Sequence, residues 1–455
     1  MWNLFRKNNK GNKGTSVTLS ITVPVALSCL GGFLNYNDNG KEIEGWLFLL
    51  YNVYKYLERY DTSLTRTIGT CGDDMKILYV MNNAYTKGNG LAGSCRRTVQ
   101  FLQDAGEDVR ILSAQGPDGE KPDYVLPDDI IPIFSGIIKK QGYAFAKCDD
   151  DVIREAVRWA DVVHLDEPFD LQIRTCKIAE EEKKALTATY HLHPENFYAS
   201  VHLRKSRYLN STTMMVWMNT VFNRCRIVQC PTENVRKRLE RWHCRAELRV
   251  ISNGMLPDEP KNLPSPIQKP DGIFLVVTTG RYSEEKDQIT LMKAMRFSKY
   301  ADRIQLVFAG RGPIEQKLRK EADVLLQNGT VRLAPIFGFY SLSELQAIYR
   351  QADLYIHCAI IEVEGMSCME AIQTGLVPII AEGKLTATPQ FALSKESIFH
   401  ERDAKELAER IDYWLSDDDR REHEEKRYIG MGAEYDIRES IEQLQQMYSD
   451  AIQDI

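Results

Sequence analysis

Strand-like and helix-like runs alternate along this chain in two successive series, and this alternation limits the folds that the chain can adopt. The helical patterns between the short apolar runs are each long enough to cross back over a sheet. Parallel strands need such crossovers, so each series predicts a doubly wound parallel sheet. The sequence therefore predicts an α/β protein with two Rossmann-like domains.

The first series occupies 75–255, and the second occupies 273–455 and is expected to finish with closing helices. A strand at 330–333 is expected within the second series. Between the two, 256–272 holds five prolines and no apolar period, which predicts a linker. A chain of 455 residues is also too long for a single core.

The first part of the chain, 1–74, differs from the two series. Cations precede a run at 15–34 that resembles a signal sequence or a weak membrane span. Its many Ser and Thr residues, a proline and a glycine pair make it a poor span. We expect 1–74 to be a poorly packed extension, with Met75 as an alternative biological start.

Composition favours a cytoplasmic protein without a metal. The ten cysteines show no CxxC spacing and are scattered through apolar runs, as reduced core cysteines are. His191 and His193 have the spacing of metal ligands, but nothing nearby completes a tetrahedral set. No metal or other cofactor is expected.

Acidic residues surround the start of one expected helix in the second series. Glu362 and Gly365 follow a strand-like run, and Glu370 lies one turn into the helix. The amides of Gly365, Met366 and Ser367 would then face phosphates, while Glu370 accepts ribose hydroxyls and Glu362 reaches a sugar. The alternative is a solvated helix cap.

A glycine-rich loop follows the first expected strand. Gly88, Gly90 and Gly93 match the letters of a dinucleotide-binding motif, but the second strand ends at 112–115 without the acid that would bind ribose. NAD or FAD binding is therefore disfavoured. The open alternatives are a flexible loop whose amides approach a phosphate or sugar and a simple turn.

Two cations follow the first strand of the second series, where ligands of open α/β sheets gather. Arg281 and Lys286 could neutralise a diphosphate leaving group. A solvated loop paired with Glu284 and Glu285 is the alternative. Gly310 belongs to a second tight turn between a strand and a helix, which by itself indicates only an α/β connection.

Two further features concern the first series. His191 follows a strand and could act as a polar group in the cleft, although a structural role is common for such a histidine. Residues Arg204–Arg249 contain eleven Lys or Arg against three acids. This region could rest on an anionic membrane surface, with a solvated helix face as the alternative. Nucleic acid is disfavoured because no stacking platform accompanies the charge.

From Met75 onward, the order of motifs resembles the retaining family-4, or group 1, glycosyltransferases of GT-B fold. The matching pieces are the glycine-rich loop, Asp161–His164, Tyr190–His191, Val250–Gly254, Gly280–Lys286, Phe308–Pro313 and Glu362–Ala371. The resemblance implies two domains that face each other across a cleft. It also implies a nucleotide-sugar donor on the C-terminal domain, an acceptor on the N-terminal domain and no metal.

The resemblance also implies residue roles. Arg281 and Lys286 stabilise the diphosphate, and Glu370 binds ribose. Glu362 contacts the sugar, and His191 lies beside the reacting carbon. The loop that contains Gly90 and Gly93 is expected on the donor side, as are Gly310, Gly365, Met366 and Ser367.

Two positions depart from the family pattern. Asp287 stands where the family usually has glycine, and Glu364 stands where a phenylalanine or a similar residue is common. These departures bear on the identity of the sugar and on the start of the helix. The stretch 191–196, with the basic region after it, resembles bacterial members that glycosylate membrane lipids or envelope glycans.

The expected function is transfer of a hexose from a nucleotide-activated sugar, in the first place a UDP-sugar, to a hydroxyl acceptor with the α anomer kept. The acceptor would be a membrane lipid or an envelope glycan. One alternative is an epimerase that acts on UDP-GlcNAc without an acceptor, and another is a non-catalytic nucleotide-sugar-binding protein. The sequence favours a cytoplasmic enzyme and leaves open peripheral attachment to the inner face of the membrane.

Overall fold

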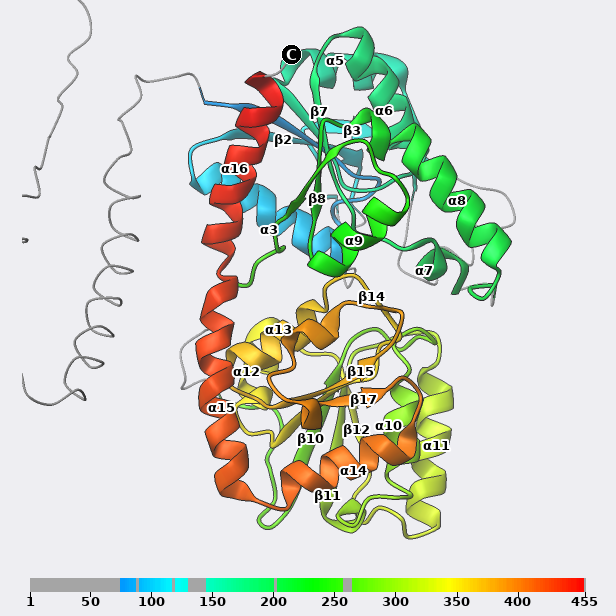
Figure 1. Cartoon of the computed structure of the whole chain (residues 1–455), viewed down its shortest axis with the longest axis vertical. Coiled ribbons are helices and arrows are strands. Elements are labelled where there is room, and N and C mark those ends of the chain that lie inside the picture. The colour runs from blue at the N-terminus through cyan, green and yellow to red at the C-terminus, as the bar shows by residue number, and fades with distance from the viewer. Residues whose placement is uncertain are drawn as a thin grey trace, which may run out of the picture. The chain divides into compact units, whose positions relative to one another are not determined.

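The computed structural model describes residues 74–86, 90–116, 119–129, 145–199, 203–256 and 264–453. Within this part of the chain, Met75–Ile455 forms one compact unit that contains two parallel sheets flanked by helices (Figure 1). The predicted extension at 1–74, including the run at 15–34, lies outside the described residues, apart from Asp74.

The N-terminal domain is built on a seven-stranded sheet of order β3-β2-β1-β6-β7-β8-β9, in which every pairing is parallel. Its strands are β1 (Lys76–Val80), β2 (Asp108–Ala114), β3 (Tyr124–Leu126), β6 (Val162–Leu165), β7 (Ala185–Thr189), β8 (Ile227–Cys230) and β9 (Glu247–Val250). The strands β6, β7 and β8 are buried along their whole length, as expected for a sheet that helices cover on both faces.

Helices cover both faces of this sheet. They are α3 (Gly90–Asp104), α5 (Asp150–Trp159), α6 (Asp170–Glu181), α7 (Pro194–Ala199), α8 (Arg207–Thr220), α9 (Glu233–Arg241) and α16 (Ile437–Gln453). Apolar side chains of α5, α6, α8 and α9 share one core cluster, and those of α3 and α16 share another. Side-chain caps start several of these helices, for example Thr232 on α9 and Ser206 on α8.

The C-terminal domain is built on a six-stranded parallel sheet of order β12-β11-β10-β13-β15-β17. Its strands are β10 (Phe274–Thr279), β11 (Ile304–Ala309), β12 (Ile336–Gly338), β13 (Leu354–His357), β15 (Pro378–Glu382) and β17 (Ile398–His400). Its helices are α10 (Gln288–Ala294), α11 (Glu315–Gln327), α12 (Leu342–Tyr349), α13 (Met366–Gln373), α14 (Ala404–Leu415) and α15 (Asp418–Gly432). Two short pairs complete the strands, β4 (Asp128–Asp129) with β5 (Phe145–Ala146), and β14 (Ile361–Glu362) with β16 (Leu385–Thr386).

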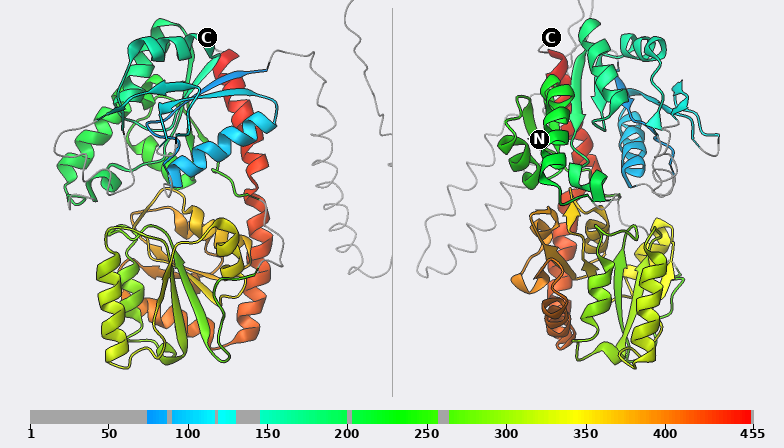
Figure 2. Two further views of the ribbon diagram at one scale, coloured as in Figure 1. Left: turned by 180° about the vertical axis from the view of Figure 1, so that it is seen from behind. Right: turned by 90° about the vertical axis from the view of Figure 1, so that its right-hand side faces the viewer.

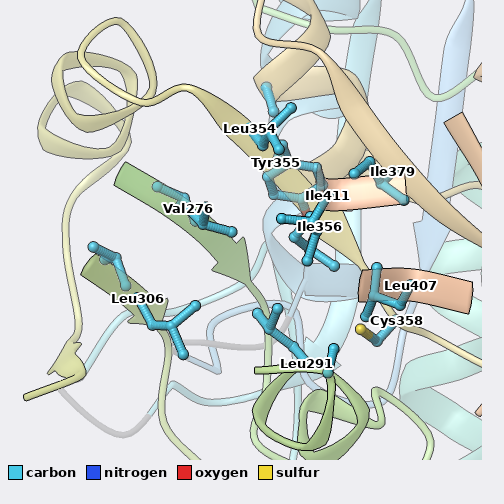
Figure 3. Close-up of a cluster of buried hydrophobic side chains, with 14 of the residues drawn as sticks. Val276, Leu291, Leu306, Leu354, Tyr355, Ile356, Cys358, Ile379, Leu407 and Ile411 are labelled. Atoms are coloured by element: carbon cyan, nitrogen blue, oxygen red, sulfur yellow. The ribbon is translucent and has the colours of Figure 1, made fainter. Parts of the chain in front are cut away.

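One apolar cluster holds the C-terminal domain together. Val276, Leu306 and Ile356 of adjacent strands meet Leu291 of α10 and Ile411 of α14 in its interior (Figure 3). All five side chains are at most 1% exposed. This core therefore packs strands β10, β11 and β13 against helices α10 and α14.

The predicted α/β fold with two Rossmann-like domains is confirmed, but the strand expected at 330–333 is wrong. The amides of Thr330 and Val331 instead bond to the carbonyl of Leu325, because Gly329 adopts a left-handed conformation and ends α11. The edge strand β12 starts only after Pro335.

The last helix, α16, departs from the expected domain limits. The sequence assigns 273–455 to the C-terminal domain, yet α16 runs back to the N-terminal domain and packs beside α3 (Figure 2). Ile437, Leu444 and Met447 are buried in one cluster with Ile77 of β1. Helix α16 therefore completes the helical cover on one face of the N-terminal sheet.

Candidate functional site

A cavity of about 1300 Å³ lies between the two domains of the unit Met75–Ile455. In each sheet the strand order reverses at one point, between β1 and β6 in the first and between β10 and β13 in the second. Ligands of open α/β sheets bind at the carboxyl ends of the strands beside such points. Arg281, two residues after β10, and Glu362, the last residue of the short strand β14 that follows β13, both line this cavity.

Two glycine turns position the first predicted cation. A Cβ atom on Gly310 would lie 2.0 Å from the carbonyl oxygen of Gly280, and one on Gly312 would lie 2.4 Å from that of Tyr282. The amide of Tyr282 donates to the carbonyl of Arg311 at 3.0 Å. The turn after β11 therefore packs directly against the turn that carries Arg281, and only glycine allows this approach.

Arg281 points into a site that does not solvate its charge. Burial lowers the pKa of its guanidinium, and the charge of Glu285 only partly opposes this effect. A buried cation of this kind is stabilised by an anionic ligand.

The second predicted cation, Lys286, forms an ion pair with Glu362. Burial raises the pKa of Glu362, but Lys286 and His357 outweigh it and lower the pKa to about 2. The Nε2 atom of His357 lies 3.4 Å from Glu362, and burial lowers the pKa of this histidine, so it is neutral at physiological pH. Lys286, predicted to bind the diphosphate, and Glu362, predicted to contact the sugar, thus contact each other.

Helix α13 starts at the cavity, and its N-terminal amides face it. Gly365 is the N-cap with φ 93°, and no side chain caps the helix. A Cβ atom at Gly365 would lie 2.8 Å from Oγ1 of Thr388, so a larger residue is excluded on two grounds. Met366 and Ser367 also line the cavity, and Tyr355 donates a hydrogen bond to Ser367 at 3.0 Å. A helix N-terminus of this kind suits a phosphate.

Glu370, one turn further along α13, is a carboxyl group for which the described residues supply no hydrogen bond. Burial raises its pKa to about 7, although the charge of Arg97 lowers it. Arg97 projects from α3 of the other domain into the same cavity. Its buried Nε atom has no hydrogen-bond partner among the described residues. Both groups are placed to bind a ligand.

His191 lines the cavity from the N-terminal domain, and its Nε2 atom lies 3.3 Å from Asp166. Burial opposes the charge of Asp166, but hydrogen bonds with His164 and His191 outweigh it and hold the pKa of this carboxyl well below its ordinary value. His193 instead contacts the hydroxyl of Tyr190 at 3.0 Å. The two predicted histidines therefore differ in role, because only His191 faces the cavity.

Gly90 and Gly93 occupy the first turn of α3 and line the cavity. Among the described residues, a Cβ atom at either position would contact no atom within 4 Å. Packing within the protein does not require these glycines, which leave the backbone of the first turn open to the cavity. Gly88 of the same motif lies outside the described residues.

Glu364 connects the two domains. Its carboxylate accepts hydrogen bonds from Ser252 at 2.5 Å and from the side chain of Asn253 at 2.5 Å. In the same region Thr232 donates to the carbonyl of Val363 at 3.1 Å. Glu364, which stands where the family usually has a phenylalanine or a similar residue, thus binds the segment that joins the domains. Its position in the motif did not reveal this role.

Much of the remaining wall of the cavity is apolar. On the C-terminal domain this apolar part includes Phe339, Tyr340, Leu345 and Val363, and the larger part belongs to the N-terminal domain. This larger part includes Phe145, Phe169, Leu192, Phe197, Tyr198, Leu203 and Leu209. Phe169 contacts both Phe145 and Trp217 edge to face, with ring centroids 5.2 and 5.9 Å apart. The cavity therefore has its cations and acids mainly on the C-terminal domain and its larger apolar surface on the N-terminal domain, which also contributes Arg97 and His191.

Ion pairs neutralise much of the predicted basic region Arg204–Arg249. The pairs are Arg224 with Glu180, Arg236 with Glu233 and Glu240, Lys237 with Glu233, Arg238 with Glu195, and Arg249 with Glu247 and Asp450. Lys205 and Arg207 make no ion pair with any described residue. The sequence count therefore overstates the free positive charge, which remains before and at the start of α8 and at the exposed Arg241 and Arg245, for which the described residues also supply no ion pair.

All of the predicted site residues that the structure describes line this one cavity. They are Gly90, Gly93, His191, Arg281, Lys286, Gly310, Glu362, Gly365, Met366, Ser367 and Glu370. Sequence reasoning missed Arg97 and Asp166, because neither belongs to a recognisable motif. Within the described ranges, no group of three or more His, Cys, Asp or Glu side chains could hold a metal ion.

Comparison with known proteins identifies the family. Residues 261–429 match the glycosyl transferases of group 1, and residues 88–259 match glycosyltransferase family 4. The chain belongs to the group 1 glycosyltransferases. The family assignment made from the sequence motifs is thus confirmed, and this glycosyltransferase is an enzyme of the hexosyltransferase type.

Relatives of this glycosyltransferase support the same assignment. The alpha-monoglucosyldiacylglycerol synthase of Streptococcus pneumoniae is 25% identical over 324 residues, which cover 68% of this chain and 71% of that protein. Two solved structures share the fold. HepE of Anabaena, in complex with UDP and glucose, gives a TM-score of 0.63 at 14% identity over 83% of this chain and all of its own. Sucrose-phosphate synthase of Thermosynechococcus elongatus gives 0.62 at 16% identity over 84% of this chain and all of its own.

Proposed function

We propose that this enzyme transfers a hexose from a UDP-hexose to a hydroxyl group of a membrane lipid and keeps the α configuration. The observation that carries the proposal is the two-sided cavity, in which charged donor residues face an apolar wall. A lipid acceptor is supported by that wall and by the pneumococcal relative, whose name specifies a monoglucosylated diacylglycerol as its product. A UDP donor is supported by the UDP complex of HepE.

The charged side of the cavity suits a nucleoside diphosphate sugar. Glu370 would accept the two ribose hydroxyls, while the amides at the start of α13 and the cations Arg281 and Lys286 would bind the diphosphate. In the empty site Lys286 is paired with Glu362. An arriving donor would place its diphosphate at the cation and its sugar at the carboxylate, so both halves of the ion pair keep a partner.

The reaction that we propose breaks the bond between the anomeric carbon and the diphosphate oxygen and forms a bond from that carbon to the acceptor oxygen on the same face. The acceptor proton passes to the departing diphosphate. Charge accumulates on this leaving group in the transition state, and Arg281 and Lys286 are placed to stabilise it. His191, on the acceptor side, would contact the reacting sugar and keep its orientation through Asp166.

The apolar wall provides the argument for a lipid. Phe169 and Phe197, 6.1 Å apart between ring centroids, lie on the side of the cavity opposite the donor cations. The acyl chains or glycerol backbone of a lipid would bury more apolar surface against these rings than a hydroxyl-rich sugar acceptor would. An epimerase, which needs no acceptor, would not use this wall. We therefore place the enzyme at the membrane surface.

A transfer assay tests the proposal. The full-length protein is incubated with UDP-glucose, UDP-galactose, UDP-GlcNAc or GDP-mannose and with vesicles that contain diacylglycerol. The lipid extract is then analysed by chromatography, and the coupling constant of the anomeric proton reports the configuration. We expect an α-hexosyl lipid from a UDP-hexose and about a hundredfold slower formation of it by Lys286→Ala. A β-linked product would contradict retention, and UDP release at an equal rate without acceptor would favour the epimerase.

A further inference from the structure

Helix α8 lies at the side of the N-terminal domain (Figure 1), and several apolar side chains on its outer face are exposed to solvent beside the exposed Ser211 and Asn219. Tyr208, Met215 and Val216 on this face are 79%, 52% and 43% exposed. Their spacing of seven and eight residues places them on one side of the helix, above the buried Met214, Trp217 and Met218. Arg207 is the only charged residue of the helix.

Exposed apolar side chains are concentrated in this part of the molecule. Five of the twelve large apolar side chains that are exposed in the described part of the chain lie within 197–216, including Phe197 and the 48% exposed Leu203. Single exposed apolar residues are ordinary, but several within one short segment suggest an interaction surface. This group therefore indicates a partner.

The charge around this face specifies the kind of partner. Residues 203–220 contain three cations, Arg204, Lys205 and Arg207, and no acid. Lys205 and Arg207 are exposed and make no ion pair with any described residue. An apolar face next to unpaired cations is complementary to an anionic phospholipid surface, in which acyl chains lie beneath phosphate groups.

The surface continues into the cavity. Leu203 and Phe197 are exposed, and they also line the cavity together with Tyr198 and Leu209. Exposed apolar side chains on the outside of the molecule are therefore also part of the cavity wall. A lipid could follow these side chains while keeping its apolar part out of water.

We propose that the outer face of α8, with Leu203, Lys205 and Arg207, is the surface by which this enzyme docks on an anionic phospholipid membrane. The docked bilayer would then lie at the mouth of the cavity. The lipid acceptor in this picture rests on the proposed function, whereas the docking itself does not.

Vesicle binding tests the apolar part of the surface. Full-length protein and a Tyr208→Ser/Met215→Ser/Val216→Ser variant are sedimented with vesicles of phosphatidylcholine and phosphatidylglycerol. The matched control is Phe297→Ser/Val324→Ser, which removes apolar side chains that are 56% and 39% exposed on the C-terminal domain. We expect the α8 variant to partition at least tenfold less and the control to stay within twofold of wild type. Equal partitioning of the α8 variant and wild type would overturn the proposal, and would point to another part such as 15–34.

The charged part of the surface has its own test. A Lys205→Glu/Arg207→Glu variant should bind anionic vesicles at least tenfold less at low salt and lose most of the salt dependence of wild type, because screening acts on those two charges. A Tyr208→Trp variant should show a blue-shifted emission on vesicles, and Phe297→Trp should not. The absence of a shift at position 208 counts against docking through α8.

Two further measurements separate this inference from the proposed function. The α8 variants should bind UDP within twofold of wild type and transfer sugar normally to a short-chain diacylglycerol that dissolves in water, while losing activity on diacylglycerol in vesicles. If no lipid is glycosylated at all but the vesicle results hold, the docking surface stands and the lipid acceptor is wrong. If lipid is glycosylated equally well by the α8 variants in vesicles, the docking surface is wrong.

Discussion

At the scale of single residues, Glu370 and Arg97 form an unusual pair, because each faces the cavity from a different domain. Burial raises the pKa of Glu370 to about 7, although the charge of Arg97 lowers it. Tyr349 and Tyr355 lie nearby, and burial raises the pKa of both well above the ordinary value, so they are neutral. The charge of Glu370 therefore depends on pH near neutrality.

We predict that donor affinity rises with pH through this range. In the empty protein the raised pKa means that the carboxyl is mostly protonated below pH 7, and stability falls as pH rises from the unfolded value towards 7. Two ribose hydroxyls bind best to the ionised form, so donor binding should release a proton. Calorimetry with UDP-glucose should show affinity increasing up to about tenfold per pH unit below 7 and levelling above it. Glu370→Gln should bind the donor weakly, with an affinity that does not change with pH. An unchanged pH dependence in this variant would show that Glu370 is not the titrating group.

A second prediction concerns Arg97. Its positive charge favours the ionised form of Glu370, so Arg97→Met should move the midpoint of the affinity profile to higher pH and weaken donor binding at pH 7. Binding should partly recover at pH 9, when the carboxyl ionises without help. Arg96→Met is the matched control, because Arg96 bonds to the carbonyl of Ala84 and does not line the cavity. A midpoint that stays in place in Arg97→Met would show that the two groups do not interact.

The third prediction addresses the leaving group. Arg281→Ala and Lys286→Ala should each lower kcat by on the order of a hundredfold by removing transition-state charge stabilisation. Lys286→Ala also leaves Glu362 without its cation, so its effect on KM for the donor should be the larger. Steady-state kinetics with saturating acceptor separate the effect on kcat from the effect on KM for the donor. Near-normal kcat in either variant would remove that cation from the mechanism.

The motif residues were predictable from the sequence because they follow strand ends and helix starts, which apolar patterns locate. Arg281 follows β10 in this way, and Glu370 lies one turn into α13. Arg97 was not predictable, since nothing in its local sequence shows that α3 faces α13 across the cavity. Glu364 appeared only as a departure from a pattern, because its partners Ser252 and Asn253 lie more than a hundred positions away.

At the scale of elements, the two glycine turns beside β10 and β11 couple the fold to the chemistry. The amide of Gly310 donates to the carbonyl of Gly338 at 2.7 Å, so the turn is held by β12 on one side and by the Arg281 turn on the other. The contact that a Cβ atom would make is with the backbone of Gly280, which cannot rotate away.

We predict that Gly310→Ala lowers both stability and activity. The added methyl group must push the two turns apart, at a cost of about 1–3 kcal/mol, and the shift displaces Arg281. Thermal denaturation should therefore show a lower Tm, and kcat/KM should fall at least tenfold. Gly430→Ala in α15 is the control, because a Cβ atom there meets nothing within 4 Å and alanine favours a helix. A variant at 310 that is fully active would show that the site tolerates movement of this turn.

Errors in the predicted elements have local causes. The segment 330–333 has the composition of a strand, but its amides are used to end α11. Helix α15 has a highly charged sequence, which is typical of a solvated segment, yet Arg421, Glu424 and Tyr428 on one side of it are buried. Arg421 is neutralised there by Asp353 and Asp418, at 3.5 and 2.8 Å, which are contacts that the sequence pattern does not reveal.

At the scale of the whole molecule, the chain crosses between its two domains twice, once after β9 and once before α16. Gly254 marks the contact of these crossings, because its φ is 68° and a Cβ atom there would lie 2.5 Å from Cα of Ile437. The amide of Met255 also donates to the carbonyl of Tyr435 at 2.8 Å. No described helix is both long and apolar enough to span a bilayer.

The last prediction compares the two ends of the chain. Six α16 side chains are buried in the cluster that covers one face of the N-terminal sheet, and they are Ile437, Ile441, Leu444, Met447, Tyr448 and Ala451. Five of the six, all except Ala451, are large, and burial of a large apolar side chain contributes about 1.5–3 kcal/mol. Losing these five therefore removes on the order of 10 kcal/mol, which is comparable to the whole stability of a domain. The hydroxyl of Tyr448 also bonds to that of Tyr79 at 2.7 Å in this interior.

A protein that ends at Tyr435 should therefore lose the folded N-terminal domain, even though the removed residues follow the C-terminal domain in sequence. A protein that starts at Met75 should fold and keep transferase activity, because β1 begins at Lys76 and Met75–Ile455 is one compact unit. Circular dichroism, thermal unfolding and UDP binding would compare both with the full chain. Cooperative unfolding of the protein without α16 at the wild-type temperature would show that the N-terminal sheet does not need this helix, and would restore the domain limits that the sequence suggests.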